Sequence, residues 1–181
     1  MRNVFFLLLF YSLTYTAFAQ EEVKPRPSPN AIVTMKYEDT YIKVTYCQPH
    51  MRGRNVFGEL VPYGEVWRTG ANEATEITLT NNILLNGNEL KAGTYSIFTI
   101  PYKDKWTIII NKGLGMWGAY NYTPDQDVMR FDVEVEKLEN ISWEAFTISF
   151  EQNSAAADLT LVWDKIKVNI PIKFLEIMRI D

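Results

Sequence analysis

The segment Ile32–Tyr46, IVTMKYEDTYIKVTY, decides the fold class of this chain. Apolar and polar side chains alternate with a period of two on both sides of the corner Glu38–Asp39–Thr40. This period places successive side chains on opposite faces of a β-strand, so each half predicts a strand with one buried and one hydrated face. The short polar corner between the two halves predicts a hairpin.

Segments of the same kind follow along most of the chain, and turn residues separate them about every 8–12 residues. One separator is Asn86–Gly87, a dipeptide that favours a tight hairpin turn. No segment keeps a helical period over three turns. We therefore predict an all-β protein that forms one domain, an antiparallel β-sandwich, jelly-roll-like, of about nine or ten strands.

The segment Trp106–Asn111 is predicted to be a central strand. Trp106, Ile108 and Ile110 alternate with Thr107 and Ile109, so large apolar groups occur on both of its faces. A strand with two apolar faces is covered on both sides. We expect a loop or a second layer to lie over the face that carries Ile109.

The N-terminus has the pattern of a secretory signal peptide over residues 1–19. Arg2 precedes the apolar run Val4–Leu13, and Ala17–Phe18–Ala19 supplies the small residues of a cleavage site. The apolar run is shorter than the ~20 residues of a membrane-spanning helix, which favours cleavage after Ala19 over a membrane anchor. Residues 20–30 contain three alternating prolines and predict an extended linker. We expect residues 31–181 to form the domain, in a periplasmic or secreted protein that leaves the membrane after cleavage.

Composition excludes several classes of function. The chain has 18 basic and 22 acidic residues, a net charge of −4, and no basic cluster, which argues against nucleic acid and anionic membranes as partners. Cys47 is the single cysteine, so no internal disulfide forms, and its alternating segment predicts a small buried side chain. His50 is the single histidine, which argues against a metal site or a histidine-dependent triad.

The segment Gly53–Thr75, GRNVFGELVPYGEVWRTGANEAT, predicts an ordered loop system that holds charged groups in place. Near its end, Gly70 and Asn72 tolerate a left-handed backbone and predict a sharp turn. Arg68 stands beside Trp67 in this turn. A guanidinium fixed in this way can bind a carboxylate or a phosphate with two parallel hydrogen bonds.

Three interpretations of this turn remain open. In the first, Arg68 and Asn72 point into a ligand pocket. In the second, Arg68 is an internal brace that pairs with Glu65 or Glu73, since a buried arginine needs a partner. In the third, Glu65 and Glu73 are the acid and base of a hydrolase, although the sequence cannot supply the fixed separation that such a pair requires.

A second candidate is the loop segment Met116–Tyr122, MWGAYNY. Trp117 and Tyr120 have flat apolar faces with a polar group, which suit sugars and other small ligands. The alternative is that the loop folds back and plugs one end of the domain.

These motifs resemble the bacterial family catalogued as domain of unknown function 2911, over about residues 29–172 of this chain. The resemblance implies an exported β-rich domain and no reaction. One segment differs, because Gln48 stands where members of the family usually have an arginine, so Cys47 and His50 are read as local substitutions. The matching segments are Gly53–Arg54, Phe57–Gly58, Leu60–Gly64, Trp67–Glu73, Ala92–Tyr95, Ile100–Pro101, Trp106 and Trp117–Tyr120.

The best hypothesis from the sequence is an extracytoplasmic module that binds a small polar ligand, either a saccharide or an anionic metabolite, without a cofactor or a metal. The alternative is a structural or interaction domain of the cell envelope, and a carboxylate hydrolase ranks below both because no catalytic motif is present. The predicted ligand-binding residues are Arg68, Asn72, Glu73, Trp67, Trp117 and Tyr120.

Overall fold

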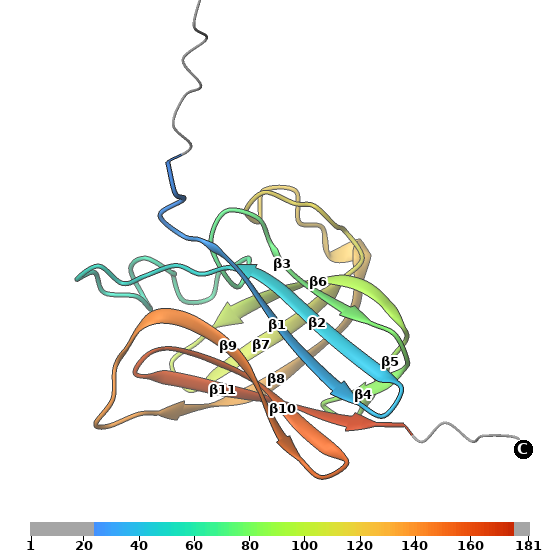
Figure 1. The fold of residues 1–181 in the computed structure, drawn as a ribbon. Helices are drawn as coiled ribbons and strands as arrows, with labels where there is room; N and C mark the ends of the chain where they lie inside the picture. The colour runs from blue at the N-terminus through green and yellow to red at the C-terminus, as the bar shows by residue number, and fades with distance from the viewer. Residues whose placement is uncertain (1–23, 176–181) are drawn as a thin grey trace, which may run out of the picture.

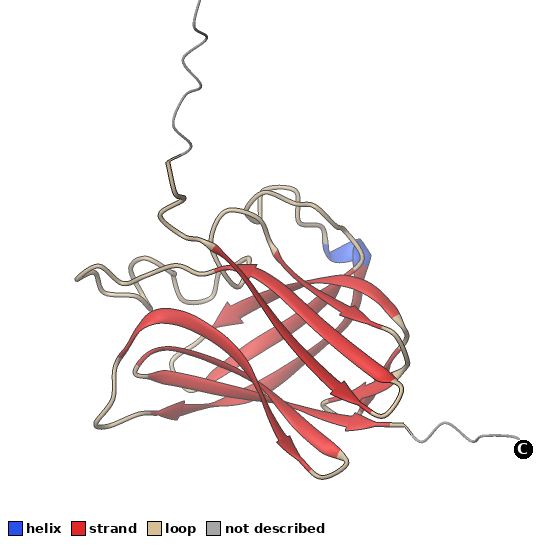
Figure 2. Cartoon of the chain, viewed as in Figure 1, coloured by secondary structure: helices blue, strands red, loops and turns tan. Residues whose placement is uncertain are grey.

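A computed structural model describes residues 24–175 of the chain, and eleven β-strands make up most of this range (Figure 1). The helical element in the described range is the short 3₁₀ turn η1 (Pro124–Gln126), which is blue in Figure 2. The strands are β1 (Asn30–Tyr37), β2 (Thr40–Cys47), β3 (Thr75–Leu79), β4 (Ile83–Leu85), β5 (Asn88–Leu90), β6 (Gly93–Pro101), β7 (Lys105–Asn111), β8 (Asp127–Lys137), β9 (Trp143–Asn153), β10 (Ala156–Asp164) and β11 (Ile166–Phe174).

The strands form one antiparallel sheet in the order β1-β2-β3-β6-β7-β8-β11-β10-β9, with β4 paired to β11 and to β5. The chain just after β2 then meets the start of β9. The amide of Met51 donates to the carbonyl of Glu144 at 2.8 Å, and the amide of Phe146 donates to the carbonyl of Pro49 at 2.9 Å. The sheet therefore curls into a nearly closed barrel (Figure 1).

The all-β antiparallel prediction is confirmed, but the shape is a barrel of eleven strands and not a jelly-roll-like sandwich of nine or ten. The difference arises at β8. Its first part pairs with β7, and its last residues pair with β11, where Val135 lies opposite Val168. One strand thus continues the hydrogen bonding across the position at which a sandwich would separate into two layers.

The predicted hairpins are present. The segment Ile32–Tyr46 forms β1 and β2, joined by a tight turn at Glu38 and Asp39. Asn86 and Gly87 both have positive φ, 47° and 78°, as a type I′ turn requires, and they join β4 to β5.

Large aromatic side chains fill the barrel at one end. The Trp67 ring lies within 5.1–6.4 Å of four other aromatic rings, measured between centroids, and its Nε1–H donates to the Gly70 carbonyl at 3.0 Å. These rings belong to Phe57, Trp106, Phe146 and Trp163. The loop that carries Phe57 and Trp67 is therefore part of the core, and its position is fixed by burial.

β7 is covered on both faces, as predicted. Trp106, Ile108 and Ile110 point into the barrel and join its main core. Ile109 points outward and packs with Phe98 in a second cluster that Met116 closes from the loop after β7.

The described residues before β1, 24–29, lie against the barrel and are called the N-terminal segment below. The amide of Gln48 donates to the Pro29 carbonyl at 2.8 Å, and the Arg52 guanidinium donates to the Pro27 carbonyl at 2.8 Å. The predicted signal peptide, residues 1–19, lies outside the described residues. Between residues 24 and 175, no helix is long and apolar enough to cross a membrane.

Candidate functional site

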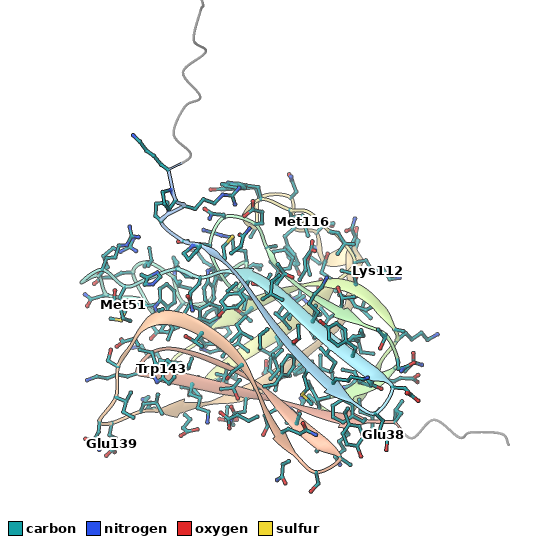
Figure 3. All side chains as sticks on the ribbon, in the orientation of Figure 1. Glu38, Met51, Lys112, Met116, Glu139 and Trp143 are labelled. Atoms are coloured by element: carbon teal, nitrogen blue, oxygen red, sulfur yellow. The ribbon has the colours of Figure 1, made fainter. Side chains whose placement is uncertain are left out.

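The predicted site residues lie at the end of the barrel from which the N-terminal segment emerges (Figure 1). Two long loops meet there, residues 48–74 and residues 112–126. Figure 3 labels Met51 on the first loop and Met116 on the second, while Glu38 marks the opposite end of the barrel.

The turn that carries Arg68 has a strained backbone. Thr69 has a φ of 56° and Asn72 a φ of 54°, and a left-handed conformation is costly for a β-branched residue such as threonine. Thr69 is fully buried, its carbonyl accepts a hydrogen bond from Oγ1 of Thr75 at 2.6 Å, and its hydroxyl donates to Oγ1 of Thr99 at 3.2 Å. Tertiary contacts therefore hold Thr69 in this conformation.

Asn72 adopts the left-handed backbone that the sequence predicts, whereas Gly70 does not. Gly70 is needed because the backbone passes close to the end of β2. A Cβ atom at Gly70 would lie 3.0 Å from the Cys47 carbonyl oxygen and 3.2 Å from Oγ1 of Thr75. The next amide, that of Ala71, donates to the same Cys47 carbonyl at 3.0 Å.

The guanidinium of Arg68 is unpaired within residues 24–175. Its Nε atom is buried without a hydrogen-bond partner, and neither Glu65 nor Glu73 forms an ion pair with it. Burial lowers the pKa of Arg68, while the nearby groups of Tyr120 and Cys47 act in the opposite direction. A cation without a carboxylate partner is therefore held partly out of water, an arrangement that costs stability.

Arg68 lines a cavity of about 260 Å³, called the Arg68 cavity below. Its lining contains two arginines, Arg54 and Arg68, and no acidic residue, while Asn72 adds an amide. The full lining is Ser28, Pro49, Arg54, Leu60, Val61, Trp67, Arg68, Gly70, Ala71, Asn72 and Trp163. The cavity is therefore positively charged, and apolar side chains such as Val61 and Trp163 complete its lining.

Arg54 is fixed by carbonyl groups of its own turn. Its Nε–H donates to the Met51 carbonyl at 2.9 Å, and a terminal N–H donates to the His50 carbonyl at 2.8 Å. These bonds set the plane of the guanidinium without neutralising its charge. Arg54 therefore adds a second positioned cation to the cavity.

Glu73 faces away from the Arg68 cavity and pairs with the N-terminal segment. Its two carboxylate oxygens accept hydrogen bonds from Arg26 at 2.8 and 3.0 Å. These bonds, with that of the Cys47 thiol, lower the pKa of Glu73 to about 2. Glu73 therefore stays ionised near neutral pH and is unsuited to act as a general acid.

Cys47 lies beside Glu73 in a second cavity of about 280 Å³, which Asn30 also lines. Its buried thiol lies 2.8 Å from Oδ1 of Asn30 and 3.1 Å from Oε2 of Glu73. Burial and the neighbouring Glu73 carboxylate raise the pKa of Cys47, which keeps the thiol protonated. The prediction of a small buried cysteine is confirmed.

Trp117 and Tyr120 line neither of these cavities. Both side chains are turned to solvent, 55% and 85% exposed, on the loop beside the Arg68 cavity. Backbone contacts join this loop to the turn of Arg68, since Gly118 N–H donates to the Asn72 carbonyl at 2.8 Å and Trp117 forms a bridge with Glu73. Met116 is buried at the same time, so the loop both covers the barrel and presents aromatic rings.

The base of this loop is held by a polar network. The Asp127 carboxylate accepts hydrogen bonds from Asn111 at 2.8 Å, from Tyr122 at 2.9 Å and from Arg130. Tyr122 in turn packs on Phe98, with the ring centroids 5.0 Å apart. The loop therefore has an anchored base, which limits the movement of the exposed rings.

Sequence reasoning missed three residues of this region. The sequence assigns Arg54 to the loop system Gly53–Thr75 and Arg26 to the linker, and it singles out neither of them, nor Trp163, as a site residue. The GR step at Gly53–Arg54 was a usable signal, because it lies in the same loop system as Arg68. Nothing in the sequence places Trp163 or Arg26 near that loop.

A metal centre has no support in the described part of the chain, where no group of three or more His, Cys, Asp or Glu side chains could hold an ion.

A family model described as "Protein of unknown function (DUF2911)" matches residues 28–172. The chain belongs to this family. A search of curated proteins and a search of solved structures found no match. The match to DUF2911 spans the whole barrel apart from the last two residues of β11.

Proposed function

We propose that this protein is a binding module that holds a small anionic ligand in the Arg68 cavity. The observation that carries the proposal is the unpaired guanidinium of Arg68, whose buried Nε lacks a hydrogen-bond partner. A bound carboxylate, phosphate or sulfate would accept charge-assisted hydrogen bonds from the terminal N–H groups of this guanidinium, which have no partner among the described residues. The ligand would thus supply the anionic partner that Arg68 lacks among the described residues.

The charge of the cavity supports the same conclusion. Arg54 and Arg68 both line it, and none of its lining residues is acidic. Two cations that line one cavity raise the local positive potential, which attracts an anion. Asn72 adds an amide that can bind polar groups of the ligand.

The local backbone supports a functional role for this turn. Thr69 keeps a left-handed conformation directly after Arg68. Backbone strain of this kind gathers at ligand sites, where neighbouring contacts hold it. The buried hydrogen bonds of Thr69 to Thr75 and Thr99 provide that support here.

The two alternatives to binding require contacts that are different from those described. A brace needs Arg68 to pair with Glu65 or Glu73, but Glu73 is engaged by Arg26. A hydrolase needs two carboxylates that face one cavity, but neither Glu65 nor Glu73 lines the Arg68 cavity, and the pKa of Glu73, about 2, does not suit a general acid. Binding requires neither contact and uses the groups that are free.

The site would act outside the cytoplasm, because residues 1–19 have the pattern of an export signal. A protein with a net negative charge repels anions on average. It can bind one only where positive charge is concentrated locally. The Arg68 cavity meets this condition, since both its charged lining residues are basic in a chain with a net charge of −4.

Thermal shift measurements on the chain without residues 1–19 test this proposal. Inorganic phosphate, sulfate and acetate are titrated at constant ionic strength into the wild type and Arg68→Lys, which keeps the charge and loses the planar fork. We expect a saturable rise of the melting temperature in the wild type and its loss in Arg68→Lys. The control is Lys36→Gln, which removes an exposed cation on β1, near the opposite end of the barrel.

An equal shift in all three proteins would indicate general salt effects and would contradict the proposal. So would the absence of a shift with every anion.

A further inference from the structure

We infer that the ligand of the Arg68 cavity is an acidic saccharide, whose anionic group enters the cavity while a sugar ring lies on Trp117 and Tyr120. These two side chains are called the aromatic ledge below. The inference rests on the proposed function and adds the class of ligand to it. The juxtaposition that supports it is an arginine-lined cavity beside two exposed aromatic rings on an anchored loop.

The size of the cavity is the first step of the argument. Its volume is about 260 Å³, whereas sites that enclose a whole small molecule occupy roughly 300–1,000 Å³. A single anionic group fits inside, and the remainder of a metabolite or sugar would lie outside. The surface at the rim of the cavity then decides which ligand binds.

The aromatic ledge adjoins that rim. Gly118 N–H donates to the carbonyl of Asn72, a cavity-lining residue, at 2.8 Å. The bridge between Trp117 and Glu73 fixes the neighbouring position of the loop. Tyr120 also raises the pKa of the Arg68 guanidinium, against the effect of burial.

The ring of Tyr120 is positioned by its own loop. It packs on the backbone at Gly118, where a Cβ atom would lie 2.8 and 2.9 Å from two of its ring carbons. Gly118 has a φ of 67°, which favours glycine at this position. Part of the ring therefore lies against Gly118, while 85% of the residue remains exposed.

The exposure of the ledge favours a sugar over an aromatic ligand. An aromatic ring gains most of its binding energy when apolar surface is removed from water in an enclosed site. A sugar stacks one apolar face on an aromatic ring and keeps its hydroxyl groups hydrated, so an open ledge suits it. The side-chain amide of Asn72, which lines the cavity next to the loop that carries the aromatic ledge, can bind a hydroxyl group of the sugar.

Calorimetric titration of the chain without residues 1–19 tests the inference with five probes. These are inorganic phosphate, glucose, glucose 6-phosphate, glucuronate and phenyl phosphate. We expect at least one acidic sugar to bind about tenfold or more tightly than inorganic phosphate. Glucose alone should bind weakly or not at all, since it lacks the anionic group.

Variants of the ledge separate its contribution from that of Arg68. Trp117→Ala and Tyr120→Ala should each weaken the binding of the acidic sugar by about three- to tenfold and leave the affinity for inorganic phosphate unchanged. Arg68→Lys should weaken both probes. The matched control is Tyr41→Ala, which removes a tyrosine that is 38% exposed on β2 at the opposite end of the barrel, and it should change neither.

The outcomes distinguish the two proposals. If inorganic phosphate binds in an Arg68-dependent manner but the ledge variants have no effect, the saccharide inference is wrong and the anion site stands. Phenyl phosphate that binds as tightly as the best acidic sugar would also overturn the saccharide inference. If no probe binds the wild type, or if Arg68→Lys binds all of them normally, both proposals fail.

Discussion

Arg68→Met should make the free protein more stable while it abolishes anion binding. In the wild type the Arg68 guanidinium has a buried Nε without a partner, and an unsatisfied buried polar group costs about 1–3 kcal/mol. Methionine keeps an unbranched apolar stem and removes the polar group. Part of the gain is offset by lost packing, so we expect the free energy of unfolding to rise by about 1 kcal/mol. For a domain of this size such a change raises the melting temperature by roughly 2–4 °C.

The assay is urea denaturation followed by tryptophan fluorescence, with thermal melting as a second measure. Arg54→Met is the matched control. Arg54 donates to the carbonyls of Met51 and His50, so its removal should lower stability by roughly 0.5–1.5 kcal/mol. Both substitutions remove one positive charge from the same cavity. A general effect of charge would therefore not explain changes of opposite sign in the free energy of unfolding.

A loss of stability in Arg68→Met that equals or exceeds the loss in Arg54→Met would refute this reasoning. It would mean that Arg68 has partners in solution and braces the loop, and the anion site would lose its main support.

Three further changes test other parts of the structure. Trp106→Ala should lower the free energy of unfolding by about 3–5 kcal/mol in urea, because the ring is buried inside the barrel; an unchanged midpoint would show that it is not. Glu73 has a pKa of about 2 against an ordinary value of 4.5, so its carboxylate stabilises the fold above pH 4.5 and this contribution is lost as the pH falls toward 2. The Arg26–Glu73 pair is exposed, so the effect is small, and urea midpoints at pH 7 and pH 3 should differ less in Glu73→Gln than in the wild type. Gly118→Ala should destabilise the protein by about 1 kcal/mol and shift the Tyr120 ring signals in NMR spectra, since its Cβ would meet that ring; unshifted signals would mean that Gly118 does not position Tyr120.

The strands of this protein could be predicted from its sequence because each carries its own signal. Ile32–Tyr46 alternates without interruption, and Asn86–Gly87 specifies the turn between β4 and β5. The apolar residues on both faces of Trp106–Asn111 predicted that a loop or a second layer would cover Ile109, and Met116 from the loop after β7 does so. These signals depend on local periodicity and turn chemistry, which need no knowledge of distant contacts.

The closure of the sheet could not be predicted in the same way. A sandwich and a barrel both require alternating strands with one wet face. What decides between them is the pairing of β8 with both β7 and β11, together with the contact of Met51 with Glu144. These contacts join residues that are far apart in the sequence.

The candidate site shows the same limit. The sequence identified Arg68 and Asn72 and left the partner of Arg68 open between a ligand and two acids. That choice depends on Arg26, which lies 47 residues before Glu73 and engages its carboxylate. The second arginine of the cavity, Arg54, lies in the same loop as Arg68, whereas the lining residue Trp163 comes from β10. Only the folded structure brings these side chains together.

The most direct test of the central claim follows the Arg68 Nε–H group itself. The ¹H–¹⁵N spectrum of the arginine side chains is recorded during a titration with inorganic phosphate, and the Arg68 signal is assigned by its absence in Arg68→Lys. We predict that this signal moves in a saturable manner as the anion binds the same guanidinium. An Arg68 signal that stays unchanged while phosphate and the acidic sugars are added to saturating levels would contradict the account.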